Sequence, residues 1–500
     1  MDWTDLQEAW GWFAEHVLIV LPYALFALDV VLRIAAVIVV PRNRRPQSAF
    51  AWLLAIMVLP IVGFPLYLML GQAQLPRKRR EKQRVVNRLM RARSMDIPDS
   101  DLDEDSPSWL QSAVALNREL GAYPLTGGNS ADLEIDYQTS LDRMAEDVRG
   151  ARETVHVLFY AAGLDDWTQN FFDAVGEAAD RGVKVRCLYD HFGSFKYWGS
   201  YRRMIRFLDA HDVEHYSMMP IKPFRDGAFQ RPDLRNHRKL VVVDGEVGWM
   251  GSQNLIAAHY NKKKLIRAGV RWQETMVRLQ GPIVSEMNLL FGIDWFFESD
   301  EFITEDQLVK PHPEADGPYE CQLAPSGPGF VLENNLLLFN QLFYSASKRI
   351  VAVSPYFVPD ESMLYALITA AKRGVEIELF VSEKGDQFLV SHAQRSYYTT
   401  LLQAGVRIQM YREPAILHAK HITVDDSVTV IGSSNMDIRS FILDMESSLM
   451  VGGSDFMVRM HEIEDVYRSR SRELTLEEWE ARPWYVKIVD NTCRLASSIV

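Results

Sequence analysis

Cysteine is scarce in this chain of 500 residues, which contains only Cys187, Cys321 and Cys493. The three are far apart and odd in number, which argues against a disulfide framework and is typical of a reducing compartment. An excess of positive charge is also missing, because the formal net charge is -12. The overall composition therefore gives no reason to expect a nucleic acid as partner.

Metal-ligand patterns are absent from the sequence as well. No group of His, Cys, Asp and Glu has the spacing of a metal site, so the sequence predicts no bound metal. The hydrophobic share of 48% and the charged share of 24% are those of an ordinary folded protein. A chain of this length has room for two or three domains.

Two long hydrophobic runs lie near the N-terminus. The first, residues 17–40, is interrupted only by Asp29 and Arg33, which are four residues apart and can pair on one helix face. The second, residues 49–70, carries no charge. Because about 20 helical residues cross a bilayer core, each run is long enough to span. The acidic N-terminus is unlike that of a cleaved signal peptide.

The basic residues that follow the second run predict the orientation of this anchor. Positive segments tend to stay inside, so the chain after Leu70 is expected in the cytoplasm. The favoured prediction is a two-helix transmembrane hairpin, with the arginines between the runs outside. A re-entrant second segment is the alternative, because Pro60, Gly63 and Pro65 interrupt that run.

Beyond an acidic linker the chain repeats itself. The segment from Glu153, ETVHVLFYAAGLDDWTQNFFDAVGEAADRGVKVRCLYD, resembles the segment from Lys348, KRIVAVSPYFVPDESMLYALITAAKRGVEIELFVSEKGD. In both, a strand, a loop with acidic residues, an amphipathic helix and a second strand follow one another. Strands that alternate with helices predict an α/β fold, and two such halves predict a pseudo-dimer with a site between them.

The sequence thus divides into four parts. Residues 1–75 are predicted as the membrane anchor and 76–118 as a basic juxtamembrane segment with an acidic linker. Residues 119–310 form the first α/β half, and 311–500 form the second half with a C-terminal interfacial segment. That segment carries Trp479, Trp484 and Tyr485 beside basic residues, a composition that suits a membrane interface. The basic juxtamembrane stretch has helical apolar spacing and could lie on an anionic membrane surface or form a solvated helix face.

Each half contains the same motif, NHRKLVVVDGEVGWMGSQN at 236–254 and LHAKHITVDDSVTVIGSSN at 417–435. Both copies have His to Lys at plus 2 and His to Asp at plus 7. These residues are His237, Lys239 and Asp244 in the first copy and His418, Lys420 and Asp425 in the second. Alternate residues on a strand point to the same face, so each His and Lys project together. One such match is a weak signal, but two with identical spacing are a strong one.

Two halves related by a pseudo-two-fold axis would bring both motifs to one pocket that suits a phosphate diester. Lysine supplies positive charge, and hydroxyl and amide groups supply hydrogen-bond donors. These phosphate-binding candidates are Ser252, Asn254, Ser433 and Asn435. One imidazole can attack phosphorus while the other protonates the leaving alkoxide, and the lysines stabilise the equatorial oxygens.

Two glutamates complete the predicted site. Glu274 lies 37 residues after His237, and Glu446 lies 28 residues after His418. A carboxylate partner fixes the tautomer and orientation of an imidazole, so both glutamates are predicted to orient the histidines. Asp244 and Asp425 fall in tight turns, where backbone bonding is favoured over a direct catalytic role.

The duplicated His-x-Lys-x4-Asp motif resembles the signature of the phospholipase D superfamily over residues 120–480. PSGPG at Pro325, SPYFVPD at Ser354 and NMDIRSFILDMES at Asn435 further resemble bacterial cardiolipin synthases of the phospholipase D type. This resemblance implies condensation of two phosphatidylglycerols into cardiolipin and glycerol through a phosphatidyl-histidine, without an obligatory metal or other cofactor. It also implies His237 as the nucleophile and His418 as the acid that becomes the base, which the repeat symmetry itself leaves open.

The resemblance implies phosphatidylglycerol, other anionic phospholipids and the bilayer as partners, no nucleic acid, and the bacterial inner membrane as location. A homo-oligomer stays open. Lys262–Lys264 depart from the family pattern, because they lengthen the segment before Glu274. Basic residues around the first motif could contact headgroups or be ordinary loop charges. They are Lys222, Arg225, Arg231, Arg235, Lys262, Lys263, Lys264 and Arg267.

Four other functions remain in competition at this point. A membrane-bound phospholipase D would use water as acceptor, and a related transferase would use another alcohol. A nuclease of the same superfamily is disfavoured by the hydrophobic runs and the net acidity. A non-catalytic membrane scaffold is disfavoured by two intact His-Lys sets.

Overall fold

The computed structural model describes residues 3–42, 46–71, 75, 77–95, 97–102, 106–221, 231–310 and 316–495. The chain forms two compact units, Met1–Ala73 and Gln74–Val500. Arg44 and Arg45, which lie between the two hydrophobic runs, and Lys222 and Arg225, which precede the first motif, are outside the described residues.

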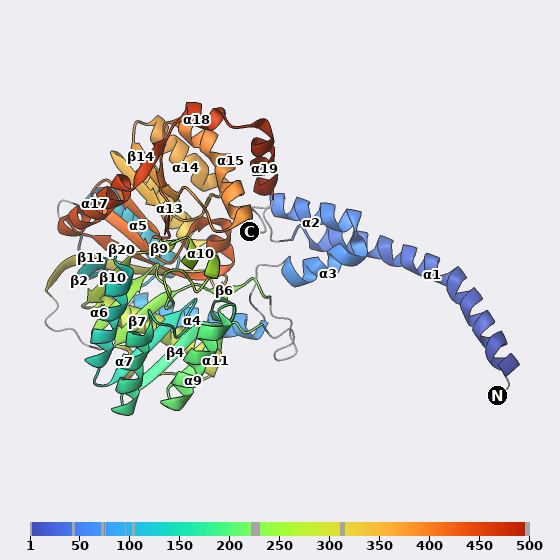
Figure 1. Ribbon diagram of the computed structural model, residues 1–500, viewed down its shortest axis with the longest axis horizontal. Helices are drawn as coiled ribbons and strands as arrows, with labels where there is room; N and C mark the ends of the chain where they lie inside the picture. The colour runs from blue at the N-terminus through green and yellow to red at the C-terminus, as the bar shows by residue number, and fades with distance from the viewer. Residues whose placement is uncertain are drawn as a thin grey trace. The chain divides into compact units, whose positions relative to one another are not determined.

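The N-terminal unit consists of the helices α1 (Trp3–Val39), α2 (Pro46–Val58) and α3 (Pro60–Leu70) (Figure 1). Within α1, the 21 residues Ile19–Val39 are long and apolar enough to cross a membrane. The second hydrophobic run differs from the single spanning helix that was favoured, because it forms two helices of 13 and 11 residues. At 1.5 Å rise per residue, neither spans a core about 30 Å thick.

Pro60 explains this break. It is the first residue of α3, and a proline lacks the backbone N–H that a continuous helix would need and clashes with the preceding turn. The two short helices then pack closely at Gly63, where a Cβ atom would lie 3.0 Å from the Ala55 carbonyl oxygen. The interruption that the sequence showed therefore produces a short helical hairpin.

The predicted pairing of Asp29 with Arg33 is confirmed. Arg33 Nε lies 2.7 Å from Asp29 Oδ2. Arg33 Nη1 also donates to the carbonyl oxygen of Met57, at 2.6 Å. Since Met57 is in the last turn of α2, where carbonyl groups lack helical partners, the ionisable pair of α1 is bound to protein.

Two mixed sheets form the framework of the larger unit, one for each sequence repeat (Figure 1). The strands of the first sheet are β2 (Ser130–Glu134), β3 (Thr154–Phe159), β4 (Lys184–Asp190), β5 (Glu214–Met218), β7 (Lys239–Val243), β8 (Val247–Gly251) and β10 (Met276–Gln280). Their counterparts in the second sheet are β11 (Gly317–Ser326), β12 (Arg349–Val353), β14 (Glu376–Ser382), β15 (Arg407–Tyr411), β17 (His421–Val424), β18 (Val428–Gly432) and β20 (Asp444–Gly452).

The strand order confirms the duplication. The first sheet runs β2-β10-β8-β7-β3-β4-β5, and the second contains β11-β20-β18-β17-β12-β14-β15, which is the same path. In each sheet the last three strands are parallel, and the motif strand joins them antiparallel. The second sheet is extended at one end by β1 (Thr126–Gly128) and at the other by β21 (Ser471–Leu474).

Helices cover the outer face of each sheet, and one apolar core joins the two inner faces. The outer helices are α6 (Tyr137–Arg149), α7 (Gln169–Asp180) and α9 (Trp198–Ala210) in the first half and α13 (Asn334–Ser345), α14 (Glu361–Lys372) and α15 (Phe388–Ala404) in the second. Leu240 and Val242 of β7 share a buried cluster with Val351 of β12 and Phe380 of β14. The shared cluster also contains residues of α11 (Ile283–Ser299) and α17 (Ser454–Ser469).

The basic juxtamembrane stretch forms α4 (Arg77–Met95), and part of it packs on protein. Arg79 Nη1 lies 2.6 Å from Glu298 Oε1, and its guanidinium lies 5.2 Å from the ring centre of Phe297. Lys82 pairs with Asp300 at the end of the same helix, α11. This face of α4 is therefore occupied by the first half.

Candidate active site

A short strand before each histidine pairs with a strand of the opposite half. β6 (Arg235–Asn236) pairs in parallel with β20, and β16 (Ala415–Leu417) pairs in parallel with β9 (Arg271–Gln273). The backbone N–H of His237 then donates to the Met445 carbonyl at 2.8 Å, and that of His418 donates to the Gln273 carbonyl at 2.7 Å. Each histidine therefore lies beside the residue that precedes the opposite half's glutamate.

Because of this crossing, each histidine bonds the glutamate of the other half. His237 Nδ1 lies 3.0 Å from Glu446 Oε1, and His418 Nδ1 lies 2.7 Å from Glu274 Oε1. The sequence analysis related each glutamate to the histidine of its own half. In the structure, each glutamate instead bonds the histidine of the other half. An imidazole held through Nδ1 leaves Nε2 as the nitrogen available to a substrate.

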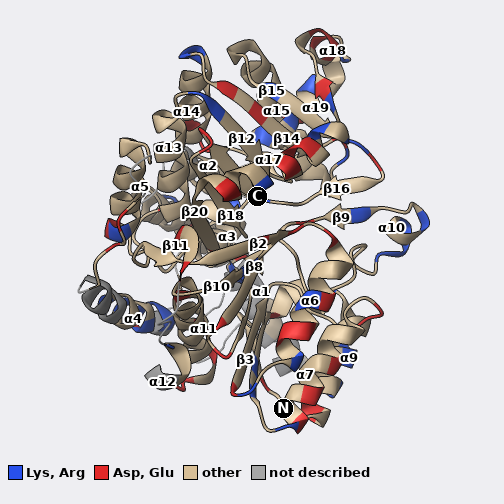
Figure 2. Ribbon diagram, turned by 90° about the vertical axis from the view of Figure 1, so that its left-hand side faces the viewer, with Lys and Arg blue, Asp and Glu red and all other residues tan. Residues whose placement is uncertain are grey.

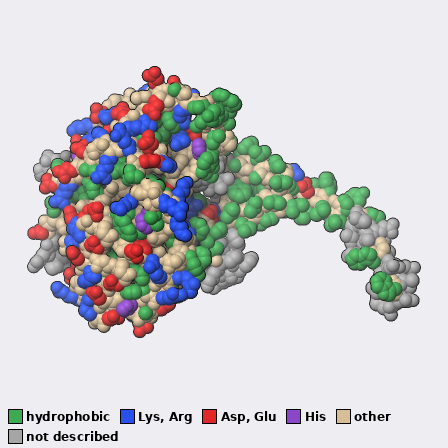
Figure 3. Space-filling view, viewed as in Figure 1, with side chains coloured by type: hydrophobic (Ala, Val, Ile, Leu, Met, Phe, Trp, Pro, Cys, Tyr) green, Lys and Arg blue, Asp and Glu red, His purple; other side chains and the backbone are tan. Residues whose placement is uncertain are grey.

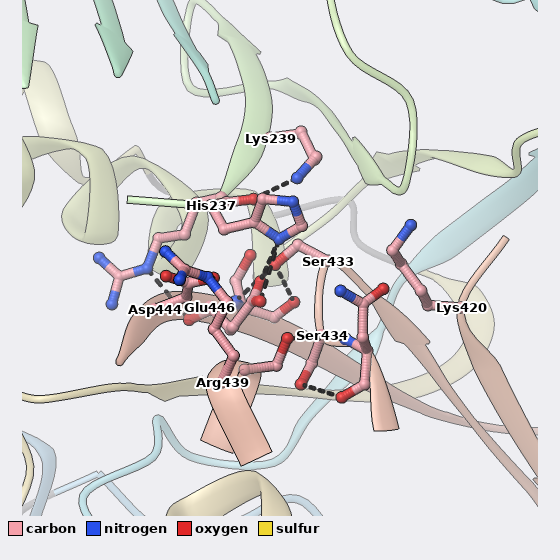
Figure 4. A network of polar contacts seen from close by, with 12 residues as sticks. His237, Lys239, Lys420, Ser433, Ser434, Arg439, Asp444 and Glu446 are labelled. Atoms are coloured by element: carbon pink, nitrogen blue, oxygen red, sulfur yellow. Dashed lines mark hydrogen bonds and ion pairs between the residues drawn. The ribbon is translucent and has the colours of Figure 1, made fainter. Parts of the chain in front are cut away.

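The two lysines are buried beside the histidines, with 0% of Lys239 and 2% of Lys420 exposed. Each ammonium donates to the carbonyl oxygen of the histidine two residues before it. Lys420 Nζ also lies 3.0 Å from His418 Nδ1. Figure 4 shows Lys239 and Lys420 entering the space around His237 from different parts of the chain, so both sets belong to one site.

Burial and neighbouring charge set the protonation of this site. Burial lowers the pKa of His237 well below its usual range, and the charges of Lys239 and Lys420 act in the same direction. Burial also lowers the pKa of His418. Both imidazoles are therefore neutral at neutral pH, which leaves a nitrogen lone pair for attack.

The same burial affects the charged groups. It lowers the pKa of Lys239 to about 7 and that of Lys420 to about 8. It raises the pKa of Glu446 to about 7. The positive charge available to a phosphate therefore decreases as the pH rises through this interval.

Ser252 and Ser433 bind the backbone directly after each glutamate. Ser252 Oγ donates to the carbonyl of Thr275 at 3.2 Å and accepts from its N–H at 3.0 Å. Ser433 Oγ makes the same two contacts with Ser447, at 3.3 and 3.0 Å. Since Thr275 and Ser447 each follow a glutamate directly, both hydroxyls are already engaged in positioning these segments.

The two asparagines of the motifs differ from one another. Asn254 Nδ2 donates to Tyr260 Oη at 2.7 Å, and its Oδ1 accepts from the Ala161 N–H at 3.1 Å. Asn435 is also buried, but its Oδ1 has no hydrogen-bond partner among the described residues. Only the second asparagine thus presents an unused amide oxygen at the site.

Asp244 and Asp425 bind backbone amides at the start of a strand in each half. Asp244 accepts from the N–H groups of residues 152–154, each at 2.8 Å. Asp425 accepts from those of residues 347–349, at 2.6, 2.7 and 2.9 Å. These contacts are the backbone-bonding role that their turn positions favour.

No group of three or more His, Cys, Asp or Glu side chains within the described part of the chain could hold a metal ion. Two of the basic residues near the first motif are engaged within the protein. Arg231 pairs with Asp233, and Arg235 lies 3.3 Å from Asp190.

Comparison with known proteins places this geometry in a family. Residues 144–291 and 339–465 match the family model described as cardiolipin synthase, PLD-like domain, and residues 31–72 match one described as phospholipase D-nuclease N-terminal. Cardiolipin synthase A of Proteus mirabilis is 31% identical over 471 residues, which cover 92% of this chain and 94% of that protein. Cardiolipin synthase A of Wigglesworthia glossinidia brevipalpis is 30% identical, with 90% of each chain covered.

The chain belongs to the cardiolipin synthase family of the phospholipase D superfamily.

A solved structure shows that this fold extends beyond close relatives. The phosphatidylserine synthase of Haemophilus influenzae Rd KW20 superimposes with a TM-score of 0.59 over 79% of this chain and 100% of that chain. The sequence identity is 15%, so the similarity concerns the fold.

Sequence reasoning missed a tyrosine beside each histidine of this cardiolipin synthase family member. The ring of Tyr160 packs edge-on against His237, with centres 4.8 Å apart, and that of Tyr356 packs against His418 at 6.2 Å. A tyrosine closely follows the first strand of each repeat, in FYAAG and PYFVP, one residue out of register between the two, and this is the signal that could have identified them.

Arg439 is a second missed residue. Its Nε lies 3.1 Å from Asp444 Oδ2, and its charge contributes to the lowered pKa of His237 (Figure 4). It lies in the NMDIRSFILDMES segment, which supplied a resemblance but no role.

Proposed function

We propose that this protein is a cardiolipin synthase, which transfers a phosphatidyl group from one phosphatidylglycerol to another and releases glycerol. The observation that carries the proposal is the exchange of glutamates between the halves. It supports one buried site with two oriented, neutral imidazoles and two ammonium groups. The family membership supports the same reaction.

In the first step, His237 Nε2 attacks the phosphorus of the donor lipid. A nitrogen–phosphorus bond forms, the bond from phosphorus to the headgroup glycerol oxygen breaks, and protonated His418 gives its proton to that oxygen. The anionic phosphodiester opposes the effect of burial on His418 and favours its protonated form. Lys239 and Lys420 stabilise the charge on the non-bridging oxygens.

In the second step, His418 accepts the proton of a hydroxyl group on the acceptor phosphatidylglycerol. The freed oxygen attacks phosphorus, and the nitrogen–phosphorus bond breaks, which restores His237. Since water would compete with this hydroxyl, the buried position of both imidazoles supports transfer over hydrolysis.

Incubation of the purified protein with labelled phosphatidylglycerol alone tests this proposal. Cardiolipin and glycerol in equal amounts are expected. Phosphatidic acid as the main product would instead identify a hydrolase, and the absence of any product would identify a scaffold. Addition of excess glycerol should reverse the reaction, because one phosphodiester replaces another.

The chain has the apolar helix of a membrane-associated protein, and we propose that α1 crosses the membrane once. The shortness of α2 and α3 and the contact from Arg33 to Met57 support the re-entrant alternative, in which the α2–α3 hairpin enters and leaves on the cytoplasmic side. Single cysteines at Trp3 and Lys487 can test it with an impermeant thiol reagent in intact cells. Labelling of position 3 alone supports this topology, whereas protection of both positions supports a two-helix hairpin.

We also propose that the C-terminal helix α19 (Trp484–Leu495) lies at the bilayer interface. Hydrophobic side chains gather over this helix (Figure 3) and include Trp484 and Ile488, which are 73% and 53% exposed. An environment-sensitive dye can be attached selectively to Ile488→Cys, because the native cysteines are buried. Its emission should shift to the blue when vesicles are added. The same dye on Gln403→Cys, at the far end of α15, is the control and should not respond.

A further inference from the structure

A second group of cations lies next to the catalytic site and takes no part in the chemistry above. Lys196 directly follows α8 (His191–Phe195). Its ammonium lies 5.1 Å from the ring centre of Tyr160, 5.2 Å from that of Tyr197 and 5.9 Å from that of Phe192. Such contacts hold a cation in place through the negative faces of the rings.

The tyrosine that contacts His237 links this group to the reacting centre. The ammonium of Lys239 lies 5.5 Å from the ring centre of Tyr160, so Lys239 and Lys196 rest against the same ring. The second cation is therefore one aromatic ring away from a lysine that faces the reacting phosphate.

A row of packed rings, Tyr197, Tyr260 and Trp272, forms an aromatic wall between Lys196 and another cation. Tyr197 packs against Tyr260 at 5.6 Å, and Tyr260 packs against Trp272 at 4.7 Å. The ammonium of Lys262 lies 5.6 Å from the ring centre of Trp272. Lys196 and Lys262 therefore stand on the first and last rings of one wall.

The far end of this wall lies beside the other histidine. Trp272 belongs to β9, and its partner across the parallel pairing is Ile416, two residues before His418. Figure 2 shows β9 and β16 together near the loop of α10 (Lys263–Arg267), which carries the basic residues that depart from the family pattern. The wall thus joins the surroundings of both imidazoles.

Lys196 lies close enough to other cations for their charges to act on its ammonium. Desolvation of the ammonium lowers the pKa of Lys196 to about 8, although the residue as a whole is exposed, and the charges of Lys262 and Arg439 add to this effect. Asp190 and Asp386 oppose it, but Asp190 already lies 3.3 Å from Arg235 and Asp386 accepts from Tyr356 Oη at 2.8 Å. Within the described residues, neither Lys196 nor Lys262 forms an ion pair, so an anion would relieve the repulsion.

The reaction brings a second anion to this place. An acceptor phosphatidylglycerol carries its own phosphodiester, separated by one glycerol unit from the hydroxyl that attacks, whereas water or a neutral alcohol carries none. We propose that Lys196 and Lys262, assisted by Arg439, bind the phosphate of the acceptor phosphatidylglycerol. This inference rests on the proposed function and adds the group that selects the acceptor.

Two reactions of the full-length protein separate this role from the donor chemistry. Cardiolipin formation needs an anionic acceptor, while exchange of labelled glycerol into phosphatidylglycerol uses the same histidines with a neutral one. In Lys196→Met and Lys262→Gln, cardiolipin formation should fall about 10- to 100-fold, as for the loss of a charge-assisted contact. Glycerol exchange should change less than twofold.

Variants control for a general effect on folding. Lys196→Arg keeps the charge and should retain most cardiolipin formation. Arg202→Gln removes a cation that also lies over a ring, 5.3 Å from the centre of Trp198, and should affect neither reaction. An equal fall of both reactions in Lys196→Met, or no fall in either, would overturn the acceptor role.

The phosphodiester bound by Lys196 and Lys262 could also belong to a lipid of the bilayer surface that does not react. An acceptor supplied as a monomer, without a bilayer, distinguishes the two cases. Monomeric dihexanoyl phosphatidylglycerol offers an acceptor without a bilayer, and the loss in Lys196→Met should persist with it. A loss confined to vesicles rich in anionic lipid would contradict the proposal and indicate surface binding. The proposed function is judged separately, because it fails if the unaltered protein exchanges glycerol but makes no cardiolipin.

Discussion

At the scale of single residues, the candidate active site joins two imidazoles that share one geometry and for which we propose different steps. Both bind a carboxylate through Nδ1, and both lie beside a buried lysine. The repeat symmetry alone does not assign the nucleophile, because each environment resembles the other. Their assignment therefore requires a substrate that treats the two steps differently.

A phospholipid with a p-nitrophenol headgroup is such a substrate, because its leaving group needs little protonation. His237→Ala and His418→Ala should each abolish turnover of phosphatidylglycerol. With the activated lipid, His418→Ala should still release one equivalent of p-nitrophenol rapidly, and His237→Ala should release none. The opposite result would make His418 the nucleophile.

The glutamates should follow the histidines to which they are bonded and not those of their own half. Glu446→Gln should slow the rapid p-nitrophenol release by roughly 10²- to 10⁴-fold, as expected when a histidine loses the carboxylate that orients it. Glu274→Gln should leave that release nearly intact and should slow only cardiolipin formation. Pairing within each half would predict the reverse, so stopped-flow measurement of the two variants decides the matter.

The pH dependence should reflect the lysines. As the pH rises, Lys239 and Lys420 lose the protons that neutralise the phosphate, at pKa values of about 7 and about 8. We therefore expect kcat/KM for glycerol exchange to decrease through this interval. The pKa of His237 lies well below its usual range, so no acid loss is expected at the ordinary imidazole pKa of about 6.5. A constant kcat/KM across the interval would contradict the lysine role.

At this scale the sequence predicted the histidines, lysines and glutamates that the structure brings together, because their spacing recurs in both repeats. It did not predict which glutamate contacts which histidine, since chain distance does not reveal the neighbouring sheet. Lys196 gave no signal either, because Tyr160, the ring that links it to the site, lies in another segment of the chain.

At the scale of elements, the crossing strands are the feature that assembles the site. β6 has two residues and β16 has three, too few for a periodic pattern. Most of the longer strands are continuous buried runs and the helices between them have amphipathic spacing, and the sequence predicted both well. The second hydrophobic run shows the limit of composition, because 22 apolar residues suffice to span while one proline divides the helix.

The turn aspartates should support the strands and not the chemistry. Asp425→Asn replaces one carboxylate oxygen by a donor, which leaves backbone N–H groups of residues 347–349 without an acceptor. An unsatisfied buried donor costs about 1–3 kcal/mol, so the free energy of unfolding should fall by roughly 2–4 kcal/mol. Thermal unfolding in detergent, together with kcat per folded molecule, measures both effects.

The next residue provides a matched control. Asp426 has nearly the same left-handed backbone, with φ of 54° against 52° for Asp425, and asparagine is tolerated there. The Asp426 side chain is 58% exposed, so Asp426→Asn should change stability little. Normal stability with lost kcat in Asp425→Asn would show that this carboxylate acts in the chemistry.

At the scale of the whole molecule, the halves share a hydrophobic core as well as a site. Leu240 and Val242 pack in one cluster with Val351 and Phe380, so neither half can bury its inner face alone. The sequence predicted two facing halves from the duplication, but the extent of their common core depends on packing that no local pattern contains.

This dependence predicts how a divided chain behaves. We expect a chain cut within residues 311–315 to yield two fragments that aggregate when expressed separately. Co-expression should give a soluble pair in detergent with cardiolipin formation within about tenfold of the intact chain, since the apolar faces cover each other. Soluble and active separate fragments would contradict the shared core.

The exchanged glutamates also bear on ancestry. A single ancestral repeat that folded in this way would have held a histidine without its carboxylate, and only a second identical copy could have provided it. The crosswise contacts therefore imply that a symmetric homodimer came before the duplicated gene. Fusion then freed the two copies to diverge, so that the copy with His237 could acquire Lys196 and Lys262, the proposed contacts to the incoming lipid.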